Sequence, residues 1–330
     1  MKKKRVLITG ILGQDGSYLA ELLCEKGYEV HGIEKMPLSR NADRFRQYLI
    51  SKNIHVILHE CDMNSFDEVD DLFQSLQPCE CYHLSATHYS SEISDTEKYR
   101  IDRSLYQNNV LSTLNLVYAI RNSSPETRFV LAGSCLMYDG LTQFPQNENM
   151  AFKSESIYGL SKITSSNLVS YMREKHNLRL SVAILYNHES PRRSLEFVTK
   201  KIISNLLKCK KGELNHFSLG DLNIVRDWGY AKDYVYGMWL MAQQNVPGDY
   251  ILATGQGHSV EDFLECAAGI LDIDWKKYVA TDASLIAKPL GTTLIGDPDL
   301  ARTKLQWRHS VNFSELINIM VQCEISGSLD

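Results

Sequence analysis

The sequence predicts an α/β protein built on a doubly wound parallel β-sheet, followed by a smaller mixed α/β lobe. In the first half of the 330 residues, short apolar runs alternate with longer segments of helical period. This alternation is typical of a parallel sheet covered by helices on both faces. After about residue 187 the regularity is lost, and Gly and Pro interrupt the chain, as in Val246-Pro247-Gly248. We therefore expect one domain over residues 1–186 and a second over residues 187–330.

The expected elements follow one another in order along the first domain. Strands are expected where apolar and β-branched residues run together, and helices where apolar residues recur with a period near 3.6. The expected strands are Arg5–Thr9, Glu29–Ile33, His55–His59, Cys81–Ala86, Arg128–Ser134 and Arg179–Tyr186. The expected helices are Ser17–Glu25, Phe66–Leu76, a long one that includes Asn109–Arg121, Ile157–Lys175, and Ala231–Gln243, which is expected to return to the first domain.

The bulk composition narrows the class of protein. Hydrophobic residues make up 44% of the chain, charged residues 23%, and the net charge is −5. This ordinary globular balance requires no nucleic-acid partner and no membrane partner. No segment approaches the ~18 apolar residues of a membrane span, and the basic start Lys2–Arg5 is not followed by the apolar core of a signal peptide. We therefore expect a cytoplasmic protein.

The eight cysteines are scattered along the chain and form no Cys-x-x-Cys pair. Cysteines of this kind in a reducing compartment are free thiols, and a zinc site would need a more regular spacing of ligands. We expect no disulfide and no bound metal.

A glycine-rich loop lies between the first expected strand and the first expected helix. Gly10, Gly13 and Gly16 form Gly-x-x-Gly-x-x-Gly, with Gln14 and Asp15 inside it. Such a loop lets the backbone approach a pyrophosphate, which then sits on free N–H groups at the positive end of the helix. The position between a strand and a helix distinguishes a dinucleotide-binding loop from a structural turn. These five residues therefore predict a cofactor site of the Rossmann type.

Two acidic residues bear on which dinucleotide is bound. Glu34 ends the second strand region, where its carboxylate can accept hydrogen bonds from the adenosine ribose and would repel a 2′-phosphate. This favours NAD, although Lys35 and Arg40 nearby could bind the phosphate of NADP. Asp62, after the third strand, is placed to bond the adenine amino group, and a solvated loop carboxylate is the alternative.

Tyr158 and Lys162 stand four residues apart on an expected helix. This spacing places the phenol and the ammonium on one face, and a cation beside a phenol favours the phenolate. Tyr158 can then act as a base near neutral pH, while Lys162 can also hold the nicotinamide ribose. Ser134, at the end of the fifth strand, can hydrogen-bond a reacting hydroxyl. Together with the glycine loop, these residues indicate a nicotinamide-dependent oxidoreductase.

Longer stretches of the chain carry a more specific pattern. They are Thr9–Glu21 and Glu25–Ile33 in the first domain and Asn187–Arg193, Phe197–Ile202, Arg226–Gly229, Ala231–Val235 and Ala253–Gly255 in the second lobe. On these stretches the chain resembles the extended short-chain dehydrogenase/reductases, and among them the GDP-mannose 4,6-dehydratases, nearly end to end. The run Asn-His-Glu-Ser-Pro-Arg-Arg is the most distinctive of them. The resemblance implies a Rossmann domain that binds NAD or NADP, followed by a lobe that binds a nucleotide sugar, GDP-linked in this subfamily.

The resemblance also implies roles for single residues of the site. A nucleotide and its diphosphate suit Arg and Lys donors, although for each residue alone a surface charge is the alternative. The matching substrate-binding positions are His88, Asn187, Arg192, Lys201, Arg226 and Lys288. The stretch Ser39–Arg44 resembles a family loop that reaches a neighbouring subunit, which implies a homo-oligomer, a dimer or tetramer; an ordinary surface loop is the alternative.

At one catalytic position the chain departs from the pattern it resembles. The family carries Thr-Ser-Glu where this chain has Ser134-Cys135-Leu136. In the family the glutamate takes the C5 proton and protonates the departing 6-hydroxyl, and leucine can do neither. Loss of a general acid–base costs about 10²–10⁴ in rate. The departure therefore argues against dehydration and leaves oxidation at C4 supported.

Three hypotheses follow. The first is C4 oxidation of a GDP-mannose-like nucleotide sugar, which ends as a 4-keto sugar or as a 4-epimer. The second is a 4,6-dehydratase with a replacement acid–base, for which His88 and, more weakly, Cys135 are candidates. The third is a non-catalytic nucleotide-binding subunit, against which the complete set of Ser134, Tyr158 and Lys162 argues.

Overall fold

A seven-stranded parallel sheet forms the centre of the protein in the computed structural model, which describes residues 3–34, 37–87, 95–282 and 293–330. The strand order is β11-β6-β5-β4-β1-β2-β3. The strands are β1 (Arg5–Thr9), β2 (Glu29–Glu34), β3 (Val56–Glu60), β4 (Glu80–His83), β5 (Arg128–Ala132), β6 (Leu180–Leu185) and β11 (Tyr250–Leu252). The predicted doubly wound α/β fold is confirmed.

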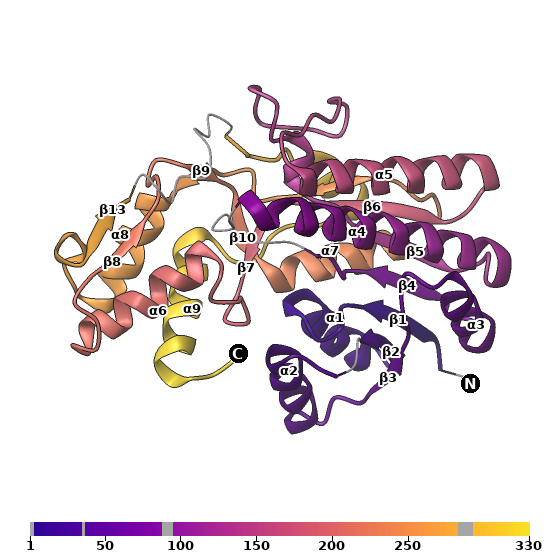
Figure 1. Cartoon of the computed structure of the whole chain (residues 1–330), viewed down its shortest axis with the longest axis horizontal. Helices are drawn as coiled ribbons and strands as arrows, with labels where there is room; N and C mark the ends of the chain where they lie inside the picture. Colours follow the sequence, from indigo (N-terminus) through magenta and orange to yellow (C-terminus); the bar gives the residue numbers. More distant parts are fainter. Residues whose placement is uncertain (1–2, 35–36, 88–94, 283–292) are drawn as a thin grey trace.

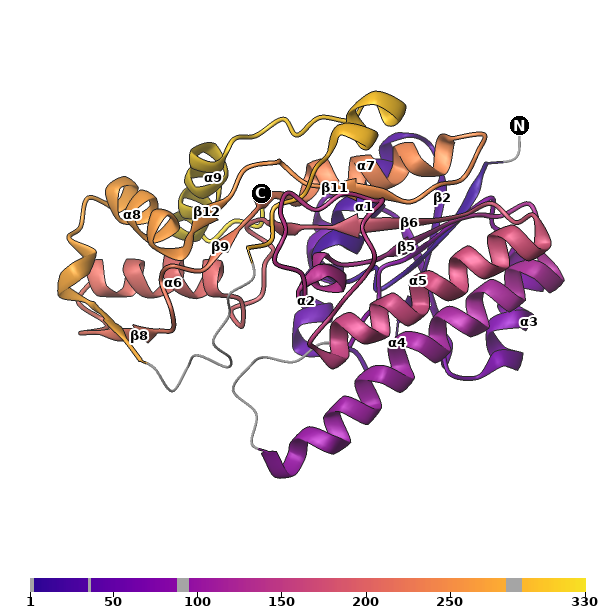
Figure 2. The same ribbon diagram turned by 90° about the horizontal axis from the view of Figure 1, so that it is seen from above.

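Helices cover both faces of this sheet (Figures 1 and 2). α1 (Gln14–Glu25) and α7 (Ala231–Gln243) lie side by side on one face. α3 (Phe66–Leu76), α4 (Asp95–Ser123) and α5 (Ile157–His176) cover the other face. Because both faces are covered, β6 is buried along its whole length, as its continuous apolar run requires.

Two differences from expectation have identifiable reasons. β4 ends at His83 and not at Ala86, and shortly beyond it the backbone of Thr87 is bonded by the side chain of Asn109. The stretch Ser39–Arg44 is not a loop. Ser39 caps α2 (Arg40–Ser51), because its hydroxyl accepts a hydrogen bond from the third residue after it.

The second lobe has a hydrophobic core of its own, centred on Trp228, Phe263 and Ile317. Three helices enclose it: α6 (Val198–Lys210), α8 (Val260–Leu271) and α9 (Phe313–Ser326). Short strand pairs complete it, namely β7 (Asn187–Glu189) with β10 (Trp228–Tyr230), β8 (Phe217–Leu219) with β13 (Val279–Thr281), and β9 (Val225–Arg226) with β12 (His258–Ser259). Single helical turns occur in both parts of the chain. They are η1 (Cys135–Tyr138), η2 (Trp275–Lys277) and η4 (Ala301–Leu305). The division after residue 186 stays a prediction.

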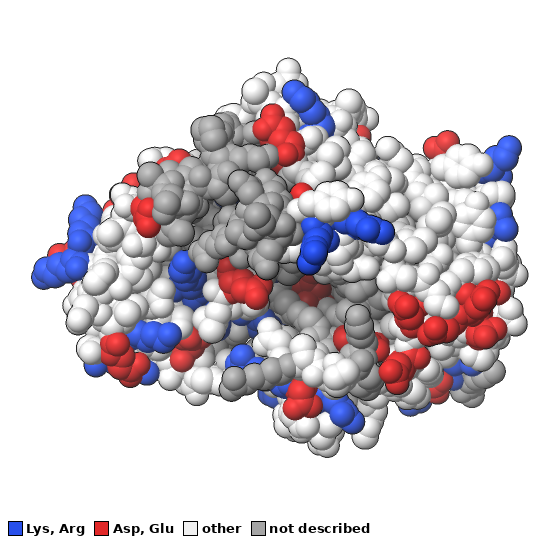
Figure 3. All heavy atoms as spheres, viewed as in Figure 1, with Lys and Arg blue, Asp and Glu red and all other residues white. Residues whose placement is uncertain are grey.

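The surface carries charges of both signs. On the face drawn in Figure 3, acidic side chains gather over α3, whereas the Lys and Arg side chains are scattered. The described part of that face therefore presents no continuous basic stripe of the kind that follows a nucleic-acid backbone. Within the described ranges, no helix combines the length and apolar character needed to cross a bilayer.

Candidate active site

The glycine loop after β1 has a backbone that only glycine can follow. Gly10 has φ +68°, and a Cβ there would lie 2.9 Å from the backbone of Ser85. A Cβ on Gly16 would lie 2.2 Å from the Gly10 carbonyl oxygen. Gly13 caps α1 without any side-chain hydrogen bond, so the N–H groups of the first helical turn carry no side-chain cap. This arrangement fits the pyrophosphate of a dinucleotide.

The two acidic residues assigned to the adenosine also bond the backbone near them. Glu34 Oε1 accepts a 2.9 Å hydrogen bond from the Leu12 N–H within the glycine loop. Asp62 is exposed, and its Oδ1 accepts a 3.0 Å hydrogen bond from the Asn64 N–H. Both carboxylates therefore shape the backbone that borders the predicted adenosine position. Their contacts with the ribose and adenine stay predictions.

Gln14 and Asp15 connect the glycine loop to the second lobe. Asp15 Oδ2 lies 2.9 Å from His188 Nε2, and Gln14 Oε1 accepts a 2.8 Å hydrogen bond from the Ser190 hydroxyl. Burial alone would raise the pKa of Asp15, but the charge and hydrogen bond of His188 outweigh burial and lower it. Burial would likewise lower the pKa of His188, but the Asp15 carboxylate raises it. The two side chains therefore form an ion pair between the domains.

The predicted catalytic residues meet where β5 ends and α5 begins. Lys162 is buried, and its Nζ donates a 2.8 Å hydrogen bond to the Ala132 carbonyl oxygen. The same Nζ lies 5.7 Å from the centroid of the Tyr158 ring. Ser134 caps η1, its hydroxyl accepting a 3.2 Å hydrogen bond from the backbone. A Cβ on Gly159 would lie 2.3 Å from the Leu136 carbonyl oxygen, so glycine is what lets α5 approach η1 so closely.

The electrostatics of this group differ from the expectation for an isolated phenol and ammonium. Burial raises the pKa of Tyr158 above its usual range, and the charge of Arg193 and the Ser134 hydroxyl act in the opposite direction. Burial also lowers the pKa of Lys162 to about 8. Lys162 alone therefore does not make Tyr158 a phenolate near neutral pH in the protein without cofactor. A further positive charge beside the phenol is required.

Asn109 supports the catalytic group and was missed by reasoning from the sequence. Its buried side-chain Nδ2 donates to the Ser161 hydroxyl and to the Thr87 carbonyl oxygen, both at 3.1 Å. Its Oδ1 accepts a 2.8 Å hydrogen bond from the Thr87 N–H. Asn109 thereby joins α4 to the residues after β4 and to the neighbour of Lys162 on α5. Nothing local in a long helix marks such an asparagine, since its partners lie on other elements.

Asn187 and Arg226, two substrate-binding candidates of the second lobe, lie close to Cys135, the residue after Ser134. The buried Cys135 thiol lies 3.8 Å from Asn187 Oδ1. Burial raises the pKa of Cys135 to about 12, against the opposing charge of Arg226. Burial lowers the pKa of Arg226, and interactions with Cys135 and Asp139 oppose that shift. Asn187 and Arg226 are thus brought to the catalytic side. Cys135 stays a thiol near neutral pH, which removes the support for its role as an acid–base.

Arg192 lies elsewhere than its predicted role requires. Its side chain is fully buried, and it donates a 2.9 Å hydrogen bond to the Ser17 hydroxyl on α1. The guanidinium also lies 3.7 Å from the Tyr18 ring centroid and pairs with Glu21 and Asp330. Because its donors are engaged between the domains, its contacts do not support diphosphate binding.

The neighbouring Arg193 is the arginine of the pair whose charge reaches the catalytic phenol. Its Nε lies 3.2 Å from the Glu189 carboxylate, and its guanidinium carbon lies 3.4 Å from the Phe197 ring centroid. Sequence reasoning named Arg192 and not Arg193, because two adjacent arginines offer no local signal of which faces the phenol; the substrate-binding role of Arg192 stays a prediction. Lys201 lies half-buried on α6. His88, Lys288 and Lys35 lie outside the described residues.

Comparison with known proteins decides the family. A sequence model described as GDP-mannose 4,6 dehydratase matches residues 7–320. The chain belongs to the GDP-mannose 4,6-dehydratase family.

Relatives in this family match almost the whole chain. GDP-mannose 4,6 dehydratase 2 of Arabidopsis thaliana is 38% identical, covering 97% of this chain and 86% of its own. GDP-mannose 4,6 dehydratase of Cricetulus griseus is 36% identical, covering 98% and 92%. Among solved structures, a UDP-glucuronic acid 4-epimerase variant of Bacillus cereus, in complex with UDP-4-deoxy-4-fluoro-glucuronic acid and NAD, has a TM-score of 0.84 at 18% identity and covers 98% of this chain and 99% of that one. At this identity the likeness shows the fold alone.

Membership of the GDP-mannose 4,6-dehydratase family confirms the resemblance found in the sequence and makes the chain an enzyme. Enzymes of this family are NAD(P)-dependent, which confirms the predicted class of cofactor. The choice of NAD over NADP and the roles of the individual residues stay predictions. So does the replacement of the family glutamate by Leu136.

Proposed function

We propose that this enzyme oxidises C4 of a GDP-mannose-like nucleotide sugar and releases a 4-keto sugar or a 4-epimer without removing water. The observation that carries the proposal is the meeting of Ser134, Tyr158 and Lys162 at the end of β5, beside an aliphatic residue, Leu136. Ser134, Tyr158 and Lys162 can together orient an alcohol and take its proton. Leu136 has no group that could take or give a proton.

Gly10, Gly13 and Gly16 would hold the pyrophosphate of the dinucleotide, since a Cβ at Gly16 would fill the space that the backbone needs. Lys162 would hold the nicotinamide ribose, and Glu34 and Asp62 the adenosine. The cofactor, when bound, accepts a hydride from the sugar. We propose NAD in preference to NADP, because a carboxylate at Glu34 would repel a 2′-phosphate.

Tyr158 acts as the base that takes the proton of the sugar 4-hydroxyl, and Ser134 orients that hydroxyl. Burial opposes the phenolate, so its formation depends on nearby positive charge. Arg193 and Lys162 supply part of that charge, and an oxidised nicotinamide bound beside Tyr158 would add to it. The proton transfer is therefore coupled to cofactor binding.

Dehydration would need a further group to take the C5 proton and to protonate the leaving hydroxyl. Leu136 has no titratable atom, and Cys135 remains protonated because burial raises its pKa to about 12. The keto sugar is therefore released, or it is reduced again on its other face. Asn187 and Arg226, with Lys201 and Lys288 as further candidates, would bind the nucleotide diphosphate.

The test is to incubate the purified enzyme with GDP-mannose and GDP-heptose, each with NAD or NADP, and to identify the products by NMR. We expect reduction of the nicotinamide or C4 epimerisation, with the 6-hydroxyl retained. Tyr158→Phe is the control, because it keeps the ring and removes the base. Efficient loss of the 6-hydroxyl would exclude the proposal. The homo-oligomer and the cytoplasmic location remain predictions.

A further inference from the structure

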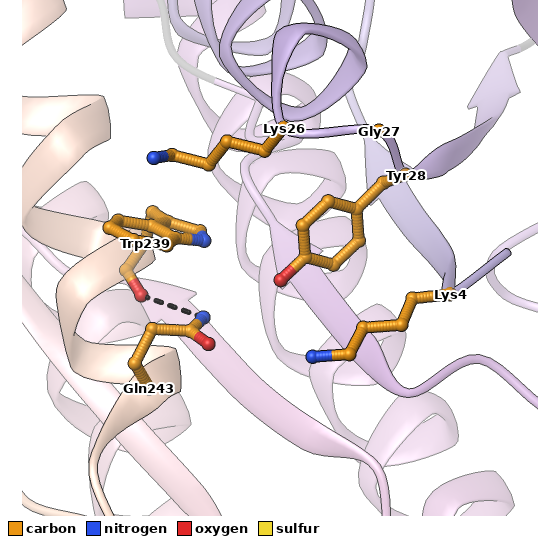
Figure 4. A pocket seen from close by; sticks show the side chains of 6 residues that line it. All are labelled: Lys4, Lys26, Gly27, Tyr28, Trp239 and Gln243. Atoms are coloured by element: carbon orange, nitrogen blue, oxygen red, sulfur yellow. Dashed lines mark hydrogen bonds between the residues drawn. The ribbon is translucent and has the colours of Figure 1, made fainter.

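A pocket of about 360 Å³ lies at the edge of the sheet opposite the candidate active site (Figure 4). Lys4 precedes β1 and Tyr28 precedes β2, so the pocket lies at the amino ends of these strands, whereas the glycine loop and Ser134 lie at carboxyl ends. Its lining comes from the start of β1, the α1–β2 turn and α7, and consists of Lys4, Lys26, Gly27, Tyr28, Trp239 and Gln243.

Two ammonium groups enter this pocket without a carboxylate partner. Lys26 Nζ lies 3.7 Å from the centroid of the Trp239 ring, and Lys4 Nζ lies 5.8 Å from that of the Tyr28 ring. Among the ion pairs of the described residues, neither lysine takes part in one. Figure 4 shows the Lys26 ammonium over the Trp239 ring and the Lys4 ammonium beside the Tyr28 ring, with Trp239 and Gln243 between them. Two cations held only by aromatic faces remain available to an anion.

A buried donor faces the same space. Trp239 Nε1 is buried and completes no hydrogen bond. Burial raises the pKa of Tyr28 to about 12, and the nearby indole N–H opposes that rise, but the phenol oxygen is not placed to accept a well-formed hydrogen bond from it. Buried N–H groups without an acceptor are uncommon in folded proteins. An acceptor supplied by a ligand would satisfy this one.

The nearest carboxylate does not neutralise the two lysines. Glu80 is buried, and its Oε1 accepts hydrogen bonds from the Tyr28 hydroxyl at 2.8 Å and from Gln243 Nε2 at 3.1 Å. Its Oε2 accepts a 2.7 Å hydrogen bond from the Tyr82 hydroxyl. Glu80 therefore fixes the wall of the pocket, and its charge is distributed over three donors.

We propose that this pocket binds the phosphate group of a small phosphorylated metabolite, with Lys4 and Lys26 on either side and the Trp239 N–H as a third donor. Two ammoniums match the charge of a phosphate dianion, and lysine binds phosphate as a point charge. The volume is in the range of small-molecule sites, about 300–1,000 Å³. The proposal does not depend on the enzyme's reaction.

The experiment is a titration of the full-length enzyme, saturated with NAD, with inorganic phosphate, a nucleoside 5′-monophosphate and acetate, followed by calorimetry and tryptophan fluorescence. We expect phosphate-bearing probes to bind and to perturb fluorescence. Lys4→Met and Lys26→Met should each weaken binding about tenfold, the loss of one charged donor. Trp239→Phe should weaken it less and remove the fluorescence change.

Arg226→Ala is the matched control, because it removes a cation from the candidate active site and leaves this pocket intact. Probe binding at this pocket, followed by the Trp239 fluorescence change, should equal that of the unmodified enzyme, whereas any binding of a probe in the candidate active site should weaken. Lys4 and Lys26 are exposed, so their variants should keep the circular dichroism spectrum of the parent. Three results would overturn the proposal: no binding at millimolar probe, equal binding by the Lys4→Met/Lys26→Met double variant, or tighter binding of acetate than of phosphate.

Discussion

The two sides of the candidate active site are built from different kinds of backbone. The sheet side consists of the glycine loop, η1 and the start of α5, which follow long, buried parallel strands. The lobe side consists of β7 and β9, strands of three and two residues, and the turn around Arg192 and Arg193. Parallel strands force their carboxyl ends to one edge, so the sheet side can be placed from sequence. The lobe side depends on tertiary contacts and cannot be placed from sequence.

The largest effect should come from the sheet side. Tyr158→Phe should lower kcat for C4 oxidation by about 10²–10⁴, because it removes the base while keeping the packed ring. The dissociation constant of NAD, measured by fluorescence, should stay within a few-fold, since the glycine loop is unchanged. A Tyr158→Phe variant that kept most of its turnover would show that the catalytic base does not lie on the sheet side.

On the lobe side, the adjacent Arg192 and Arg193 should contribute differently to stability and to turnover. Arg192→Ala should lower the free energy of unfolding by about 3–5 kcal/mol, because it leaves the carboxylates of Glu21 and Asp330 without their buried partner. Arg193→Ala should lower that free energy by less, because Glu189 loses this ion-pair partner but keeps the hydrogen bond from Thr199. It should in addition slow turnover of the folded enzyme, because it removes a charge that favours the Tyr158 phenolate. Urea denaturation and steady-state kinetics on both variants separate the two roles. Equal loss of stability in both would mean that the pair acts as one structural unit.

Arg226→Ala tests whether the lobe side binds substrate. We expect KM for the nucleotide sugar to rise about 10- to 100-fold, which corresponds to one or two charged hydrogen bonds. NAD affinity should be unaltered, because Arg226 faces Cys135 and not the glycine loop. Arg226→Lys should recover part of the affinity. An unchanged KM in both variants would remove Arg226 from the substrate site.

A pH-dependent effect, small at neutral pH, concerns the buried support of the sheet side. His83 is bonded to Thr9 and Ser112, and burial lowers its pKa to about 3. Between about pH 6.5 and 3 the unfolded chain binds a proton that the folded chain does not. Stability should therefore fall with falling pH in that window, by at most about 1.4 kcal/mol per pH unit from this group. Thermal unfolding of the parent and of His83→Asn checks this, and identical pH slopes would speak against it.

The fold could be predicted because β1, β5 and β6 carry the buried apolar runs that a covered parallel sheet requires, and the glycine loop fixes where the first strand ends. Ser134, Tyr158 and Lys162 followed from strand-end and helix-period reasoning, and the structure brings them together. Asn109 could not be predicted, because the two partners of its side chain, Thr87 and Ser161, lie outside its own helix.

The ion pair of Asp15 and His188 was missed for a similar reason. Asp15 was assigned to the cofactor from its place in the glycine loop. The structure shows that its carboxylate also reaches the second lobe, a contact that spans the whole first domain in sequence. Patterns within one segment locate a side chain on an element, but they do not say which distant element it will meet.

The central claim is that the sheet side oxidises C4 and that Leu136 prevents the removal of water. The most direct measurement is the reaction with GDP-mannose in D₂O, with the product followed by NMR for the unmodified enzyme and for Leu136→Glu. The account predicts that the unmodified enzyme keeps the hydroxymethyl group at C6, and that only the glutamate variant forms a 6-methyl group, with deuterium from the solvent at the adjacent C5. Formation of that methyl group by the unmodified enzyme would contradict it.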